Sequence, residues 1–269
     1  MRSIVYNDVT AAGPTSLLAG VEEAACAGLG IRNLRHRSAL FELGVEANLP
    51  TGLVAAAFQQ VRTNWRTCQD LGVGRPSAQN WRWRKPQLNI AAHNASPEVV
   101  LERALIAAVE KVGRTDWSNQ VPVASGVAGS TAERRRAIDL VRQAGPGHFQ
   151  FIELKVASDT PLYAAIEIIA YACIWLVSRE HAPSLDHELL AATHIDALVL
   201  APTSYYARFQ LGPLAQLLNT EIAALGAARG VQLSFAFEAF PDGLAAARSF
   251  RAPSPNHTGR SARADGSRP

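Results

Sequence analysis

Two residue types are scarce in this chain, and each scarcity is informative. The 269 residues include 3 Lys against 23 Arg, so a lysine at any given position is unusual. The three cysteines, Cys26, Cys68 and Cys173, are odd in number and widely spaced, which excludes a disulfide framework and a cysteine-based zinc site. We therefore expect a reduced, intracellular protein of the cytoplasm.

Long hydrophobic runs are missing too. The first ten residues, MRSIVYNDVT, lack the apolar stretch of a signal peptide, so we expect no secretion. The most apolar run, 161–177, is barely long enough to span a membrane and contains Glu167. We expect it to form a buried core helix, with no membrane as a partner. The net charge of +3 permits a nucleic-acid partner without requiring one.

Three regions are expected along the chain. Residues 1–92 are predicted to form a helical N-terminal appendage, because residues 15–71 have helical periodicity without a strand pattern, and no residue of 15–71 indicates a site. The helices are expected near 15–29, 37–43 and 51–71. Residues 93–250 form the predicted core. Residues 251–269 are rich in Pro, Ser, Gly and Arg, a composition typical of a disordered basic tail.

The core region is predicted to be an α/β domain with a mixed sheet of about five strands and helices on both faces. Ser96-Pro97 marks the start of its first helix. The other expected elements are strands at 117–127, 137–141, 149–156, 195–201 and 231–237, and helices at 161–177 and 212–229. His181, His187 and His194 fall between these elements at spacings that match no zinc motif, so we interpret them as loop histidines.

The stretch 134–156 contains the residues with the clearest chemistry. Its two apolar segments are separated by an Ala-Gly-Pro-Gly turn, which predicts a β-hairpin. Asp139 interrupts the first apolar segment, and Glu153 and Lys155 interrupt the second. Residues two apart share a face of a strand, so Glu153 and Lys155 project together.

Burying these three charges without partners would be costly, so their presence needs a reason. A hard divalent cation such as Mg²⁺ takes oxygen ligands and would offset the charges of Asp139 and Glu153. Lys155 would then position or activate the attacking water and stabilise the charge that develops on a phosphate. The alternative interpretation is two acids solvated at strand ends with an extended lysine beside them.

The sequence Ile138-Asp139, followed by Glu153-Leu154-Lys155, resembles the active-site signature of the PD-(D/E)XK nuclease superfamily. Glu-x-Lys is expected by chance about 0.16 times in a chain of this composition, and it occurs once. The resemblance covers roughly residues 96–240. It departs from the family pattern at Ile138, which replaces the leading Pro of the motif, a position that does not ligate metal.

The resemblance implies a restriction-endonuclease-like core of helix, three strands, helix and strand. It implies Mg²⁺ or Mn²⁺ as the cofactor, held by Asp139, Glu153 and the Leu154 carbonyl, with Lys155 orienting the water. The activity that it implies is metal-dependent hydrolysis of phosphodiester bonds, and DNA is the expected substrate in preference to RNA.

A branch of this family carries a Glu-Arg pair on the first helix, and Glu102-Arg103 resembles that pair. The resemblance therefore implies a role at the metal for Glu102, in preference to Glu98 or Glu110. The alternative for Glu102 is a simple interaction with the helix dipole. Glu167, in the first turns of the expected helix 161–177, is implied as a residue that borders the site.

Two basic stretches are candidates for binding the nucleic acid. Their residues are Arg134, Arg135, Arg136, Arg82, Arg84 and Lys85. Trp81 and Trp83 interleave the second stretch, and such a mixture can bind phosphates and stack on bases. The alternative is a solvated arginine face whose tryptophans pack against the core.

Two other functions remain open at this point. The first is a catalytically inert relative that keeps the same fold as a nucleic-acid-binding or assembly module. The second is an interaction protein whose hairpin charges are exposed. The sequence also leaves the oligomeric state open, with a homodimer as one option.

Overall fold

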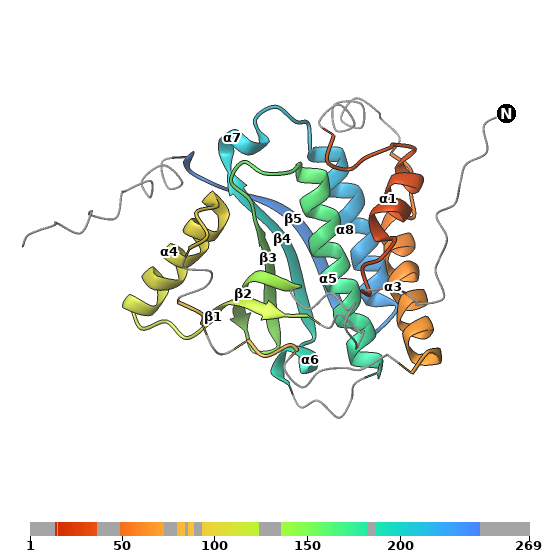
Figure 1. Cartoon of the computed structure of the whole chain (residues 1–269), viewed down its shortest axis with the longest axis horizontal. Helices are drawn as coiled ribbons and strands as arrows, with labels where there is room; N and C mark the ends of the chain where they lie inside the picture. Colours follow the sequence, from red (N-terminus) through yellow and green to blue (C-terminus); the bar gives the residue numbers. More distant parts are fainter. Residues whose placement is uncertain are drawn as a thin grey trace, which may run out of the picture.

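A five-stranded sheet lies at the centre of the molecule, with its strands in sequence order. The computed structural model describes residues 14, 16–36, 49–72, 80–83, 86–88, 93–123, 136–181 and 187–242. The strands are β1 (Trp117–Pro122), β2 (Ala137–Gly145), β3 (His148–Leu154), β4 (His194–Pro202) and β5 (Gln232–Phe240). β1, β2 and β3 are antiparallel, whereas β4 runs parallel to β3 and β5 parallel to β4. The predicted α/β class with a mixed five-stranded sheet is confirmed (Figure 1).

The predicted hairpin is formed by β2 and β3, with Gly145 paired to His148 at the turn. Gly147 has a φ of +65°, a left-handed conformation that glycine adopts without strain. β1 is an edge strand, which suits Pro122 because proline has no N–H to donate to a neighbouring strand. β1 is shorter than the predicted 117–127, and residues 124–135 lie outside the described residues.

Two long helices make the parallel connections. α5 (Pro161–His181) joins β3 to β4, and α8 (Gly212–Ala227) lies between β4 and β5. α5 is long and apolar enough to cross a membrane, but 94% of its most apolar 18-residue window is buried inside the protein. It is the core helix that the sequence predicts. The short helices α6 (Glu188–Ala191) and α7 (Thr203–Tyr206) lie at opposite ends of β4.

The N-terminal helices α1 (Val21–Leu29) and α3 (Leu53–Asp70) form a layer outside α5 and α8 (Figure 1). They share a hydrophobic cluster with the sheet, in which Trp65 of α3 and Phe149 of β3 are both buried. The helical N-terminal region therefore packs on the same core as the sheet. Two predicted segments lie outside the described residues: 37–43 and 251–269.

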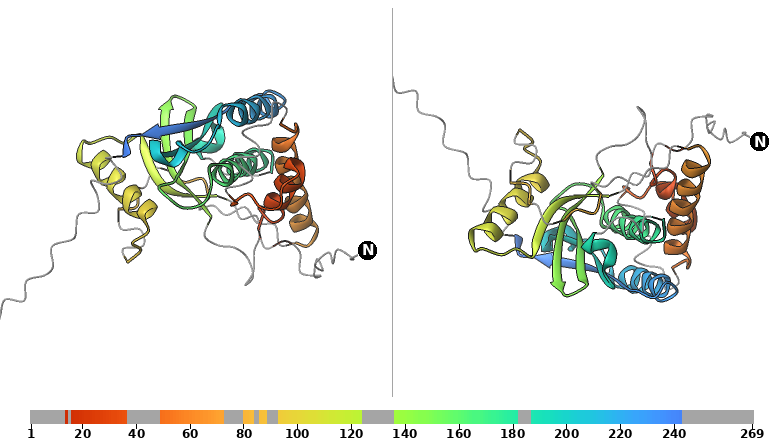
Figure 2. Two further views of the ribbon diagram at one scale, coloured as in Figure 1. Left: turned by 90° about the horizontal axis from the view of Figure 1, so that it is seen from above. Right: turned by 90° about the horizontal axis from the view of Figure 1, so that it is seen from below.

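The opposite face of the sheet is covered by α4 (Pro97–Lys111) (Figure 2). This helix begins at the predicted Ser-Pro pair. Its Leu101 and Ile106 pack in a second, smaller cluster with Leu140 of β2 and Ile152 of β3. Helices therefore flank both faces of the sheet, and the hairpin lies between α4 and α5.

The packing of α8 on β5 depends on a glycine. A Cβ added at Gly226 would lie 2.8 Å from Cγ of Leu233 and 2.9 Å from the Val231 carbonyl oxygen. We predict that Gly226→Ala lowers the free energy of unfolding by roughly 1–3 kcal/mol, because the helix must move away from the strand. Urea unfolding followed by circular dichroism measures this change.

Gly28 of α1 is the matched control, because its added Cβ would meet only Leu53 Cδ1, at 3.7 Å. Gly28→Ala should raise the free energy of unfolding by about 0.4–1 kcal/mol through reduced freedom of the unfolded chain. Equal effects of the two substitutions would contradict the proposed close approach of α8 to β5.

Candidate active site

Glu153 and Lys155 form a buried ion pair at the end of β3. Glu153 shares the α5-facing side of the strand with Phe149 and Phe151, because side chains alternate along a strand. Lys155 directly follows the strand, and its Nζ lies 2.7 Å from Oε1 of Glu153. The Lys155 side chain is 9% exposed, and the Glu153 side chain is 6% exposed. This exposure is at odds with the alternative of solvated charges at a strand end.

Asp139 lies beside Glu153 on the neighbouring strand. The pairing of Leu140 with Ile152 brings Asp139 opposite Glu153 in the antiparallel ladder, where facing Cβ atoms are about 5 Å apart. The Leu154 N–H donates a 2.9 Å hydrogen bond to Oδ2 of Asp139. Burial raises the pKa of Asp139 to about 6 in spite of this bond. Burial, followed by the charge of Asp139, raises the pKa of Glu153 well above its usual range.

Glu102 of α4 is 2% exposed, and its carboxylate contacts β1. Its Oε1 accepts a 2.9 Å hydrogen bond from Nδ2 of Asn119, and its Oε2 accepts a 3.1 Å hydrogen bond from Nε2 of Gln120. Gln120 has a φ of +48°, in a region that is uncommon for residues other than glycine. Burial, and then the Asp139 carboxylate, raise the pKa of Glu102 to about 7. Glu102 is therefore close enough to Asp139 to be affected by its charge.

Glu98 ties α4 to the loop that follows β3. Its Oε1 accepts hydrogen bonds from the N–H groups of Val156, Ala157 and Ser158 at 3.3, 3.3 and 3.2 Å, and from the Ser158 hydroxyl at 2.8 Å. Burial opposes ionisation, but hydrogen bonds from backbone N–H groups and from the Ser158 and Ser96 hydroxyls lower the pKa of Glu98 to about 2. The sequence did not indicate this anchoring role, because the loop lies about sixty residues away.

Glu167 of α5 lies beside Lys155. Its Oε2 is 3.5 Å from Nζ of Lys155, and its Oε1 is 3.1 Å from Nη1 of Arg136. Burial alone would lower the pKa of Lys155, but the charges of Glu153 and Glu167 outweigh burial and raise it. Lys155 is therefore held as an ammonium ion.

The candidates for nucleic-acid binding have different surroundings. Arg136 is ion-paired with Glu167, and Arg82 is exposed. The other four lie outside the described residues: Arg84, Lys85, Arg134 and Arg135.

The two tryptophans beside Arg82 belong to the core. Trp81 is 1% exposed and Trp83 is 3% exposed. The ring of Trp81 stacks on Phe151 at a centroid distance of 6.1 Å, and the ring of Trp83 meets the edge of Phe149 at 5.0 Å. The structure thus favours the packing interpretation, and these rings are not available to stack on bases.

Arg35, from the N-terminal region, reaches the surroundings of the site. Its Nη1 lies 2.5 Å from Oδ1 of Asp159, and its guanidinium lies 3.5 Å from the centre of the Tyr163 ring. Oδ2 of Asp159 is 3.9 Å from Nζ of Lys155. The sequence did not predict this contact, because Arg35 and Asp159 are 124 residues apart.

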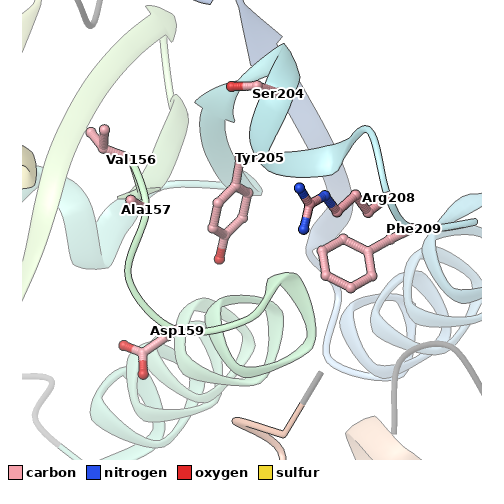
Figure 3. A pocket seen from close by; sticks show the side chains of 7 residues that line it. All are labelled: Val156, Ala157, Asp159, Ser204, Tyr205, Arg208 and Phe209. Carbon is pink, nitrogen blue, oxygen red and sulfur yellow. The ribbon is translucent and has the colours of Figure 1, made fainter. Parts of the chain in front are cut away.

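A pocket of about 270 Å³ lies beside the loop that follows Lys155. Asp159 lines it on one side, and Ser204, Tyr205, Arg208 and Phe209 line it on the other. Tyr205 and Arg208 point into the pocket from α7 and the turn after it (Figure 3). The pocket is at the carboxyl ends of β3 and β4, the edge at which ligands bind in sheets of parallel strands.

The interpretation of three histidines as loop residues is wrong for two of them. His181 is the last residue of α5 and stacks on Trp65 at 5.4 Å, and His194 is the first residue of β4. His187 lies outside the regular elements, next to the start of α6. Both elements are longer than their apolar patterns, because polar residues at their ends continue the backbone hydrogen bonding.

His148, His194 and Asp196 form a second group that could hold a metal ion, with ligand atoms within 4.8 Å of one another. The β3–β4 register pairs the two histidines, and their rings stack at 3.7 Å. Their Nε2 atoms lie 2.7 Å (His148) and 3.0 Å (His194) from the Asp196 oxygens. Two imidazoles and a carboxylate form a ligand set that zinc accepts. The hydrogen bonds to Asp196 also account for the arrangement without an ion.

A separate group of buried charges surrounds Lys155, at the other end of β3 from the histidine group. The site brings four carboxylates near two cations: Glu102, Asp139, Glu153 and Glu167 with Lys155 and Arg136. The pKa values of Glu102, Asp139 and Glu153 are raised, because burial and mutual repulsion disfavour the charged forms. Carboxylate oxygens are the ligands that Mg²⁺ and Mn²⁺ prefer, so Asp139 and Glu153 suit such an ion.

Comparisons of the chain with protein-family models, with curated proteins and with solved structures find no match. A function therefore has to be inferred from the residues and the geometry of the site.

The raised pKa of Asp139 predicts that its charge destabilises the protein when no metal is bound. Because the folded pKa of about 6 exceeds an unfolded value of about 3.9, stability is lost as pH rises between these values. Asp139→Asn should therefore raise the free energy of unfolding by roughly 1–3 kcal/mol at pH 7.5, and by much less at pH 4. Chemical unfolding in EDTA at both pH values measures the difference.

Asp116→Asn is the control, because a hydrogen bond from Arg114 lowers the pKa of Asp116. This substitution should not stabilise the protein at pH 7.5. Destabilisation by Asp139→Asn at pH 7.5 would show that the carboxylate is adequately compensated without a cation.

Proposed function

We propose that this protein is a metal-dependent nuclease of the PD-(D/E)XK type that hydrolyses phosphodiester bonds in DNA. The observation that carries the proposal is the buried Glu153–Lys155 pair, 2.7 Å apart, with Asp139 opposite it on the next strand. The element order supports it, because α4, β1, β2, β3, α5 and β4 run as helix, three strands, helix and strand. This is the order expected of the restriction-endonuclease-like core.

Asp139 and Glu153 would hold Mg²⁺ or Mn²⁺, with the Leu154 carbonyl as a third ligand. When bound, such an ion supplies positive charge to the phosphate and lowers the pKa of a bound water. The Leu154 N–H hydrogen bond fixes the Asp139 carboxylate against the end of β3. Glu102, which Asn119 and Gln120 orient, would complete the acidic group directly or through water.

Lys155 has an electrostatic role in this proposal. The charges of Glu153 and Glu167 raise its pKa, which favours the ammonium over the neutral amine that a general base requires. The ammonium would instead orient the attacking water beside Glu153 and stabilise the negative charge that develops on the phosphate. Glu167 would hold the ammonium in place, and Arg136 in turn holds Glu167. In the reaction, the water oxygen bonds to phosphorus and releases a proton to solvent, the P–O ester bond breaks, and the departing oxygen takes up a proton.

A catalytically inert nucleic-acid-binding or assembly module is the alternative function. Burying a lysine among carboxylates costs desolvation energy, and apolar residues would stabilise a binding module at least as well. The retained Asp139, Glu153 and Lys155 therefore favour an enzyme.

The proposal predicts that the protein cleaves labelled DNA only when Mg²⁺ or Mn²⁺ is present. Single-stranded, double-stranded and branched substrates should be compared, with RNA as a further substrate. Asp139→Asn, Glu153→Gln and Lys155→Ala should each reduce the cleavage rate at least about a hundredfold, because each removes a group that acts on the transition state.

Glu110→Gln is the matched control, because Glu110 is an exposed acid on α4. It should cleave DNA at the wild-type rate. Cleavage that persists in EDTA, or that survives both Asp139→Asn and Lys155→Ala, would refute the mechanism.

The raised carboxylate pKa values predict a pH-dependent activity. Metal binding requires ionised carboxylates, and the pKa values are about 6 for Asp139 and about 7 for Glu102. At limiting Mg²⁺, the cleavage rate should rise from about pH 5 to about pH 8. Glu102→Gln should move the midpoint of any remaining activity to lower pH. A pH–rate profile that is flat across this range would contradict a role for these acids at the metal.

A further inference from the structure

We infer that the pocket beside Lys155 binds one nucleotide of the substrate strand, with Arg208 contacting its phosphate and Tyr205 stacking on its base. This inference rests on the proposed function and extends it. The pocket volume of about 270 Å³ suits a single nucleotide and is too small for a duplex segment.

The position of the pocket connects it to the chemistry. Its wall includes Val156 and Asp159, and Val156 directly follows Lys155 in the chain. Glu98 holds this loop through the N–H of Val156, and Asp159 lies 3.9 Å from Nζ of Lys155. If the scissile phosphate of a nucleic-acid strand lies at Lys155, the neighbouring nucleotide of that strand would therefore lie in the pocket.

Arg208 supplies a positive charge that the described part of the chain does not neutralise. It is exposed, it points into the pocket (Figure 3), and no ion pair joins it to a described carboxylate. Other arginines near the site are paired: Arg35 with Asp159 and Arg136 with Glu167. An arginine in this state suits a phosphate group, which accepts two hydrogen bonds from a guanidinium.

The acid in the pocket wall is held by cations on the side away from Arg208. Asp159 is 2.5 Å from Arg35 and 3.9 Å from Nζ of Lys155, although Arg35 also pairs with Glu22 and Lys155 with Glu153 and Glu167. Within the pocket lining, Arg208 is the cation that a phosphate would meet.

Hydrogen bonds hold the aromatic wall in place. The Tyr205 hydroxyl donates a hydrogen bond to the Ser158 carbonyl at 3.3 Å, so its ring spans from α7 to the opposite loop. Tyr206 anchors α7 by donating a 2.7 Å hydrogen bond to the Val199 carbonyl. Phe209 lines the same side of the pocket. Aromatic side chains of this kind stack on bases of any sequence.

The test is the binding of a fluorescent single-stranded oligonucleotide to the full chain in EDTA, measured by anisotropy over a range of salt concentrations. Arg208→Ala should raise Kd about tenfold, as expected for loss of a charged hydrogen bond. It should also reduce the slope of log Kd against log salt by about 0.7, because one phosphate contact is lost. Arg208→Gln, which keeps the polar side chain, should reduce the slope equally.

Tyr205 gives a different expected result. Tyr205→Leu should raise Kd about tenfold and leave the salt slope unchanged, because stacking involves no charge. Tyr205→Phe keeps the ring and should bind within about twofold of the wild type. Arg66→Ala, an exposed arginine on the outer helix α3, is the matched control and should change neither quantity.

The outcomes separate this inference from the proposed function. If the wild type cleaves DNA but Arg208→Ala and Tyr205→Leu bind like the wild type, the pocket assignment is wrong and the nuclease proposal stands. If binding depends on both residues but no cleavage occurs with Mg²⁺ or Mn²⁺, the nuclease proposal fails and the pocket assignment stands. An equal loss of salt slope in Arg66→Ala would also overturn the inference.

Discussion

The buried ammonium of Lys155 is the interaction on which the site depends. Its Nζ lies 2.7 Å from Glu153 and 3.5 Å from Glu167, where little water is available to screen charge. Without it, two carboxylates on adjacent elements would repel each other in a region of low dielectric constant. Glu153 belongs to β3 and Glu167 belongs to α5. The ammonium of Lys155 therefore holds the end of the strand against the helix that follows it.

The loop after Lys155 is held from both faces of the sheet. On one face, Glu98 of α4 accepts hydrogen bonds from three successive N–H groups of the loop. On the other, Arg35 of the N-terminal region binds Asp159. The helical N-terminal region thus has a structural connection to the site, although its own sequence carries no recognisable chemistry. Fixing this loop matters because it forms one wall of the pocket and positions the lysine.

The two ends of β3 and β4 carry different groups. The carboxyl ends bear the acidic site and the pocket that Arg208 lines, whereas the amino ends bear the stacked pair of His148 and His194. Parallel pairing produces this separation, because all residues at the same end of two parallel strands come together. The β2–β3 hairpin brings Asp139 beside Glu153, whereas the histidine pair and the pocket also need β4 and the turn that follows it.

The sequence by itself determined the α/β class, the hairpin, the core helix α5 and the convergence of Glu153 with Lys155. Each of these follows from local patterns: alternation along a strand, a Gly-Pro-Gly turn, an apolar run, and two residues spaced by one strand repeat. The same local reasoning left Trp81 and Trp83 undecided between base stacking and the core, which their burial then resolved.

Only the tertiary structure decided the contacts between segments far apart in the chain. The pairing of His148 with His194, the reach of Arg35 to Asp159 and the anchoring of the loop by Glu98 all depend on strand register and helix packing. Register is set by the burial of whole faces and not by any one residue, so no short motif encodes it. The charged residues of the candidate site could be read from the sequence, but the partners that hold them in place could not.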